Sequence, residues 1–156
     1  MIAHIVGLGH RRIAHIMGHP DHGASEWRLQ GYRDGLEAAG IDFDEHLVVS
    51  GQFVFESGLA GAAALLSLPE PPTAIFAAND DTAAGVLHEA ARRGVRVPQD
   101  LSVFGFDDLP MARQLWPALT TVRQASRDMG RIAAEQLLLS IREPDAGGVV
   151  QVPYEL

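Results

Sequence analysis

The chain alternates short apolar runs with longer segments of helical periodicity. Apolar runs bounded by polar and turn residues are typical of buried strands, whereas apolar residues spaced three and four apart predict helices that bury one face. Strands are therefore expected at 12–17, 47–50, 74–77, 101–106, 119–123 and 149–152. Helices are expected at 22–39, 56–66, 80–93 and 127–141, and segment 1–9 resembles the last turns of another helix.

Strands that alternate with helices of this length indicate βαβ units and a parallel sheet. We therefore predict an α/β fold, with a doubly wound, Rossmann-like parallel sheet flanked by helices. A turn-rich segment at 143–148 separates the last helix from the last strand. The 156 residues have about the length of one domain, which is enough to bury a core without disulfides.

Composition excludes several classes of function. The formal charge of −8 argues against nucleic-acid binding by this chain, because affinity for phosphate backbones depends on clustered Lys and Arg. The sequence contains neither Cys nor Lys, which excludes thiolate metal sites, thiol nucleophiles and Schiff-base or Walker lysines. No apolar run is long enough to span a bilayer, and the first residues lack a signal-peptide pattern. We therefore expect a cytoplasmic protein with no membrane contact.

Two of the predicted strands end in clusters of carboxylates and amides. Buried strands that release polar groups at their carboxyl ends build the ligand site of an open α/β sheet. Asn79 and Asp107 lie nearest to their strands, so they are the expected ligand contacts, and a carboxylate accepts well from adjacent sugar hydroxyls. Asp80, Asp81 and Asp108 are expected mainly to cap helices or occupy first turns.

Two further residues near strand ends have both a structural and a ligand-binding interpretation. Arg28 is either a solvated surface residue or a bidentate ligand contact in the crevice. Phe53 either packs against the protein or stacks on a sugar ring or base.

Other candidate chemistry is weaker. The five histidines of the first 22 residues lack metal-ligand spacing, so ordinary polar or core roles are favoured over a metal site. No motif of a hydrolase, zinc protease or dinucleotide-binding protein occurs, and we predict no cofactor and no catalytic residue. Leu115 and Trp116 lie in a Pro-containing loop, where such large apolar residues either pack on the sheet edge or suit a subunit interface.

Six segments together resemble the effector-binding core of the LacI/GalR family of bacterial transcriptional repressors. They keep the family's order and spacing over nearly the whole chain: GLGHRRIAHI, RLQGYRDGLEAAG, SGQFVFESG, PTAIFAANDDTAAGVL, GVRVPQDLSVFGFDD and PALTTVRQ. The resemblance implies a periplasmic-binding-protein-like type I fold, with two subdomains around a small ligand, commonly a sugar. It also implies that the effector is held by Arg28, Phe53, Asn79, Asp107 and Gln124.

The resemblance also has implications for assembly. It implies a homodimer whose surface includes Leu115 and Trp116 together with Ala84 and Leu87 of the helix that begins at Asp80. Residues 1–124 correspond to the second subdomain, and 125–156 to a crossover helix and strand that normally return to the first. The family's helix-turn-helix and first subdomain are missing from this sequence, so operator DNA would be contacted only through that missing part. Ala125 stands where family members commonly have Pro.

Three classes of function could use a fold and a polar strand edge of this kind. The main hypothesis is the effector-binding and dimerisation core of a sugar-responsive repressor, in which ligand shifts a population of subdomain arrangements. The alternative is the solute-binding protein of a sugar transporter, which shares the fold but needs a secretion signal. A phosphoacceptor or phosphatase domain would also use clustered acids, but the absence of Lys removes its usual phosphate partner.

Overall fold

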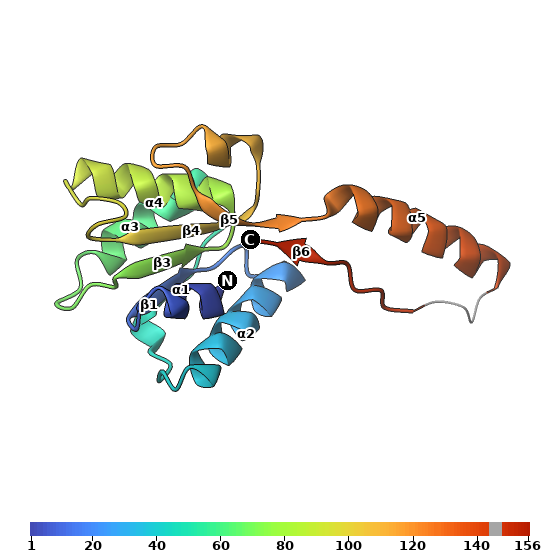
Figure 1. Cartoon of the computed structure of the whole chain (residues 1–156), viewed down its shortest axis with the longest axis horizontal. Coiled ribbons are helices and arrows are strands. Elements are labelled where there is room, and N and C mark those ends of the chain that lie inside the picture. The colour runs from blue at the N-terminus through green and yellow to red at the C-terminus, as the bar shows by residue number, and fades with distance from the viewer. Residues whose placement is uncertain (144–147) are drawn as a thin grey trace.

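The computed structural model describes residues 1–143 and 148–156. Within them the strands form one sheet in the order β2-β1-β3-β4-β5-β6, in which β6 alone is antiparallel to its neighbour (Figure 1). The strands are β1 (Ile13–Ile16), β2 (Val48–Val49), β3 (Ala74–Ala77), β4 (Ser102–Asp107), β5 (Thr120–Gln124) and β6 (Tyr154–Glu155). The parallel sheet confirms the predicted fold class.

Helices cover both faces of the sheet, with α3 and α4 on one side and α1 and α2 on the other (Figure 1). The α-helices are α1 (Ile2–Gly7), α2 (Gly23–Ala38), α3 (Phe55–Leu65), α4 (Asp80–Arg92) and α5 (Ser126–Arg142), and two short 3-10 helices are η1 (Glu45–Leu47) and η2 (Pro110–Arg113). Because side chains alternate along a strand, β1 sends Ala14 and Ile16 to the α3/α4 core. Ile13 packs instead in the α1/α2 core.

The helices α3 and α4 approach each other closely through two glycines. A Cβ on Gly58 would overlap the backbone oxygen of Thr82, and a Cβ on Gly85 would overlap the backbone oxygen of Phe55. Only glycine allows the two backbones this separation. This contact fixes the start of α4, and therefore the polar residues that precede it, against the loop before α3.

The predicted elements agree with the structure within one or two residues, apart from the last strand. Val149 and Val150 are exposed and lie outside any strand, and β6 begins only at Tyr154. A β-branched run favours a strand but forms one only where a neighbouring strand pairs with it. Here Tyr154 pairs with Gln124 and Glu155 with Arg123. The prediction of a strand at 149–152 is therefore wrong.

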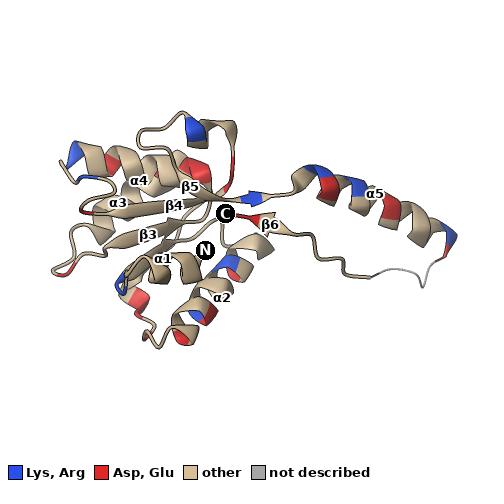
Figure 2. Cartoon of the chain, viewed as in Figure 1, with Lys and Arg blue, Asp and Glu red and all other residues tan. Residues whose placement is uncertain are grey.

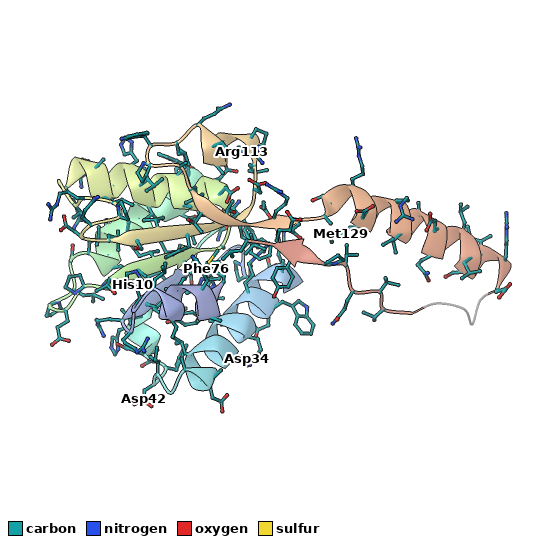
Figure 3. The ribbon with its side chains drawn as sticks, in the orientation of Figure 1. His10, Asp34, Asp42, Phe76, Arg113 and Met129 are labelled. Carbon is teal, nitrogen blue, oxygen red and sulfur yellow. The ribbon has the colours of Figure 1, made fainter. Side chains whose placement is uncertain are left out.

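The helix α5 projects away from the rest of the molecule (Figure 1). None of its 17 residues is buried, and charged residues of both signs are distributed along it (Figure 2). Met129 lies near its base, close to β6 (Figure 3). Residues 144–147, which make up most of the turn-rich segment predicted at 143–148, lie outside the described residues.

The described part of the chain holds neither a candidate membrane-spanning helix nor a candidate metal cluster. None of its helices combines the length and the apolar character that crossing a membrane requires. No group of three or more His, Cys, Asp or Glu side chains there is arranged to hold a metal ion.

Candidate functional site

The carboxyl ends of the parallel strands form the candidate site. The order of the strands reverses between β1 and β3, and open α/β sheets bind ligands outside the carboxyl ends of their strands at such a point. The predicted ligand contacts follow successive strands around this edge: Arg28 after β1, Phe53 after β2, Asn79 after β3, Asp107 at the end of β4 and Gln124 at the end of β5.

Asp107 is the centre of this group. Gln124 donates from Nε2 to Asp107 Oδ1 at 2.6 Å, and Arg28 Nη2 lies 3.7 Å from the same oxygen. The adjacent strands β4 and β5 bring Asp107 and Gln124 together, and α2 places Arg28 beside them. Within the described chain, Asp107 Oδ2 accepts no hydrogen bond. The carboxylate is therefore held in place while one oxygen is available to a ligand.

Burial disfavours the ionised forms of both Asp107 and Arg28. It raises the pKa of Asp107 above its ordinary value, although the Gln124 hydrogen bond and the Arg28 charge act in the opposite direction. Burial also lowers the pKa of Arg28, against the influence of Asp107. Both ionised groups have thus lost water without fully recovering hydrogen bonds, so a ligand that donates and accepts here would stabilise them.

The guanidinium of Arg28 lies over two aromatic rings. Its central carbon is 4.1 Å from the centroid of the Phe106 ring and 5.4 Å from that of Phe53. Stacking on an aromatic face suits the planar guanidinium and restricts its orientation. Phe106 was not among the predicted site residues. The alternation along β4 places it on the same face as Phe104, and that pattern could have identified it.

Phe53 is held in an unusual backbone conformation. Its φ angle is +62°, in the left-handed region that side chains with a Cβ rarely adopt. Asn79 Nδ2 donates to the Phe53 carbonyl oxygen at 3.0 Å, and His22 stacks on the Phe53 ring. A Cβ on Gly18 would overlap the same ring, so glycine is needed there. The loops after β1, β2 and β3 together fix this side chain.

Asn79 and Asp80 both have structural roles at the start of α4. Asn79 is the N-cap of α4, because its Oδ1 accepts from the backbone nitrogen of Thr82 at 3.0 Å. Asp80 and Asp81 lie in the first turn, as expected, but neither is the cap. Asp80 is fully buried and accepts from Leu109 N at 2.7 Å and from Thr121 Oγ1 at 2.6 Å. It therefore ties α4 to β5 and to the loop after β4, and burial raises its pKa.

Asp108 does not cap the short helix that follows it. Its carboxylate forms ion pairs with Arg123 and Arg113, whereas η2 begins after Leu109 without a side-chain cap. Figure 3 shows Arg113 on the loop segment above the sheet. The φ angles of Asp107 and Asp108 are +117° and +52°. Positive φ at non-glycine residues concentrates at functional sites, where the surrounding structure maintains it.

Two adjoining grooves open beside this cluster. One, of about 430 Å³, is lined by Arg28 and Tyr32 among others, and a second, of about 360 Å³, is lined by Met129 and Tyr154 among others. Phe106 and Gln124 contribute to both. Ligand pockets for small molecules typically have volumes of several hundred Å³ and combine apolar walls with a few polar groups.

The residues predicted to form a dimer surface differ in exposure. Trp116 is 95% exposed, and it lines a groove of about 410 Å³ with Leu87 and Pro117 among others. Leu115 is partly buried against the α3/α4 core. Ala84 and Leu87 are only 4% and 8% exposed, because α4 packs them inside the chain itself. Ala84 and Leu87 therefore offer little exposed surface, and their place in a dimer surface stays a prediction.

Comparison with known proteins identifies the class. The sequence-family model of the periplasmic binding protein-like domain matches residues 2–156, so the chain belongs to that family. Within the family, it is similar to the effector-binding domains of LacI/GalR repressors. A ribose operon repressor of Haemophilus influenzae is 38% identical over 141 residues, which cover 90% of this chain and 42% of that protein. The repressor CytR of Escherichia coli is 42% identical over 130 residues, covering 83% of this chain and 38% of that protein.

Solved structures agree with this assignment. A LacI-type regulator from Bacillus cereus subsp. cytotoxis has a TM-score of 0.93 at 30% identity, covering 99% of this chain and 55% of that one. The regulator CelR in complex with cellobiose has a TM-score of 0.90 at 37% identity, covering 99% and 48%. The chain spans about two fifths of the length of the curated relatives it matches.

Proposed function

We propose that this chain supplies one wall of the effector site of a LacI-type transcriptional repressor, and that the effector is a sugar or a related small molecule. Arg28, Phe53, Asn79, Asp107 and Gln124 are the proposed contacts. Asp107 and Gln124 would bind hydroxyl groups directly, and Arg28 would bind them or an anionic group. Phe53 would offer its ring face, and Asn79 would act mainly by fixing the Phe53 loop.

The observation that carries the proposal is that Arg28 and Gln124 both approach the same carboxylate oxygen of Asp107 at the strand edge. A purely structural ion pair would gain most from a close contact, but Arg28 remains 3.7 Å away and both partners are partly desolvated. Such incomplete satisfaction is expected of groups that wait for a ligand. The left-handed backbone at Phe53 and Asp107 supports the same interpretation.

The rest of the proposal concerns the whole protein. Residues 1–124 would form the second subdomain, and 125–156 would connect to a first subdomain that closes over the effector. Effector binding would shift the population of subdomain arrangements and thereby the affinity of a separate DNA-binding domain for its operator. Two copies would associate through the loop that carries Leu115 and Trp116. The site of action would be the cytoplasm, and we propose no catalytic role.

The choice of a repressor over a transport protein follows the relatives, which are named as transcriptional repressors, and CelR, which was solved with cellobiose. The chemistry of the strand edge alone fits either class, since both bind small polar ligands between subdomains.

A ligand panel tests the proposal. The full-length protein would be screened by thermal shift against D-ribose, other pentoses and hexoses, cellobiose, nucleosides and nucleobases. A ligand that binds the native state at a concentration of about 100 times its Kd should stabilise it by about 2.7 kcal/mol. We expect one sugar class to raise Tm and to change operator affinity in a gel-shift assay. The absence of any stabilising small molecule would contradict the proposal.

A further inference from the structure

His15 is a fully buried histidine in the middle of β1, on the face that α2 covers. It pairs in register with Phe76 of β3, and the two rings stack with centroids 4.9 Å apart and an interplanar angle of 17°. Tyr32 of α2 stacks on His15 at 5.4 Å and 26°. Figure 3 shows Phe76 at the centre of the molecule. An apolar residue would satisfy such a position, so the imidazole requires an explanation.

One ring nitrogen of His15 has a partner that determines the tautomer. Nδ1 lies 2.9 Å from the carbonyl oxygen of Phe76, which can only accept, so Nδ1 carries the proton. Nε2 is therefore an acceptor. Burial lowers the pKa of His15 to about 4, against the opposing effect of the Phe76 hydrogen bond, and the nearby charge of Arg28 lowers it further. The imidazole is neutral at pH 7.

Two buried side-chain nitrogens lack a hydrogen-bond partner within the described chain, and they are complementary. They are Nε2 of His15, an acceptor, and Nε of Arg28, a donor. Arg28 lies one helical turn before Tyr32, the residue that stacks on His15, so α2 presents both toward β1. Arg28, Tyr32 and Phe76 also line the same groove. Buried polar groups without a hydrogen-bond partner are rare in folded proteins, so each of these two nitrogens requires an explanation.

We propose that His15 is a positioning residue for Arg28. Its Nε2 accepts a hydrogen bond from one water molecule that in turn accepts from Arg28 Nε, and this fixes the guanidinium over Phe53 and Phe106 with Nη2 toward Asp107. The link itself is independent of what the site binds. Its consequence for effector affinity rests on the function proposed above.

Protonation of His15 would break this link, since it would turn the acceptor into a donor and place a positive charge beside Arg28. Within the described chain, the groups that face His15 are Arg28 and Tyr32 from α2 and the Phe76 carbonyl from β3. The charges of Asp44 and Arg12 act on Tyr32, and Met1 lines a groove with Arg28 and Tyr32. Among the described residues, Asp107 is the carboxylate that pairs with Arg28. Acid is therefore expected to release Arg28 toward Asp107 and the solvent.

The test is nitrogen-15 NMR of the chain. In the wild type we expect a His15 proton on Nδ1 only, and an Arg28 Nε–H that exchanges slowly with water. His15→Phe keeps the stacked ring and removes the acceptor, so Arg28 Nε–H exchange should accelerate by about tenfold or more, the equivalent of one hydrogen bond. His15→Gln supplies an amide acceptor and should restore part of the protection.

Tyr32→Phe is the matched control. It removes the buried hydrogen bond from Tyr32 to the Ile13 carbonyl oxygen, 2.7 Å long, from the same interface while leaving the His15 acceptor in place. Arg28 Nε–H should not change in this variant. If His15→Phe does not fold, an acid titration of Asp107→Asn decides, since the Arg28 signal should still change together with His15 when the Asp107 carboxylate cannot titrate. An Arg28 signal that is the same in wild type and His15→Phe, or that ignores the titration of His15, overturns the proposal.

Measuring effector affinity distinguishes a failure of the His15–Arg28 link from a failure of the proposed function. In the full-length protein, His15→Phe should weaken binding of D-ribose or cellobiose, whichever the wild type binds, by about tenfold, the equivalent of one hydrogen bond. An altered Arg28 signal with unchanged affinity would support the link and contradict the role of Arg28 in the effector site.

Discussion

The helices α4 and α5 have similar amphipathic sequences but very different surroundings. Nine of the 13 residues of α4 are buried, whereas none of the 17 residues of α5 is. In α4 the apolar stripe packs on the sheet and on α3, where glycines allow close contact. In α5 the exposed large apolar residues include Leu137, Leu138 and Ile141. An apolar stripe therefore shows that a helix needs a partner, but not where that partner lies.

The body of the molecule and α5 are also stabilised by different interactions. The body of the molecule, from α1 to β5, is held by its own two cores, while α5 depends on local helix propensity and on surface ion pairs such as Arg131–Glu135. Exposed pairs of this kind contribute little, and most of the stability of a helix in a protein comes from packing of its apolar face. In the domain organisation proposed above, α5 would gain a partner in the first subdomain. Three predictions sharpen this contrast.

The largest effect is expected from truncating leucines. Leu65 of α3 is 1% exposed and Leu138 of α5 is 58% exposed. Leu65→Ala should lower the free energy of unfolding of the chain by about 2–5 kcal/mol because it leaves a cavity, whereas Leu138→Ala should change it by less than about 0.5 kcal/mol. Urea denaturation followed by circular dichroism measures both. Equal losses in the two variants would show that α5 is packed in solution.

The second prediction uses pH. The pKa of His15 is lowered from 6.5 when unfolded to about 4 when folded, so the unfolded state binds the extra proton between these values. The stability contributed by His15 is therefore complete above pH 6.5 and is lost as pH falls toward 4. This loss should reach about 3 kcal/mol, at about 1.4 kcal/mol per pKa unit. The measurement compares wild type with His15→Phe at pH 7 and pH 4.

Subtracting the two variants isolates His15, because Asp80 and Asp107, whose pKa values are raised by burial, remain in both. A pH dependence that is identical in the two variants would mean that the imidazole is not buried as described. The residual helicity of α5 should not follow the titration of His15.

The smallest effect is expected from adding single methyl groups at two helical glycines. In α4, Gly85→Ala would force a Cβ against the Phe55 carbonyl oxygen and should cost about 1–3 kcal/mol. In α5, a Cβ on Gly130 meets nothing within 4 Å. Gly130→Ala should therefore be neutral or raise helix stability by up to about 1 kcal/mol. Thermal unfolding compares them, and a stabilising Gly85→Ala would contradict the close α3–α4 contact.

Much of the fold could be predicted from local patterns. Buried parallel strands such as 74–77 are continuous apolar runs between turn residues, and β3 has these bounds. The strand predicted at 149–152 failed because the partner that selects a strand lies far away in sequence: Arg123 and Gln124 pair with Glu155 and Tyr154. Pairing of this kind is a property of the tertiary fold, and the sequence pattern does not contain it.

Prediction of the site was similarly uneven. Asn79 and Asp107 could be predicted as site residues because ligands bind at the carboxyl ends of parallel strands, and polar residues that follow buried strands can be recognised in the sequence. This rule could not show that Asn79 uses its amide to cap α4 and hold the Phe53 loop, nor that Phe53 is in the left-handed region. The contact of Arg28 with Phe106 and its nearness to His15 also depend on how α2 packs against the sheet.

The central claim is that Asp107 and its neighbours bind the effector, and calorimetric titration of the full-length protein tests it most directly. Asp107→Asn keeps the size of the side chain and removes its charge, while Asp42→Asn makes the same change at the other end of α2 (Figure 3). With the sugar found in the panel, Asp107→Asn should weaken binding by about tenfold or more, since hydrogen bonds to charged groups contribute about 1.5–3 kcal/mol. Asp42→Asn should bind like the wild type. Equal affinity of wild type and Asp107→Asn would contradict the claim.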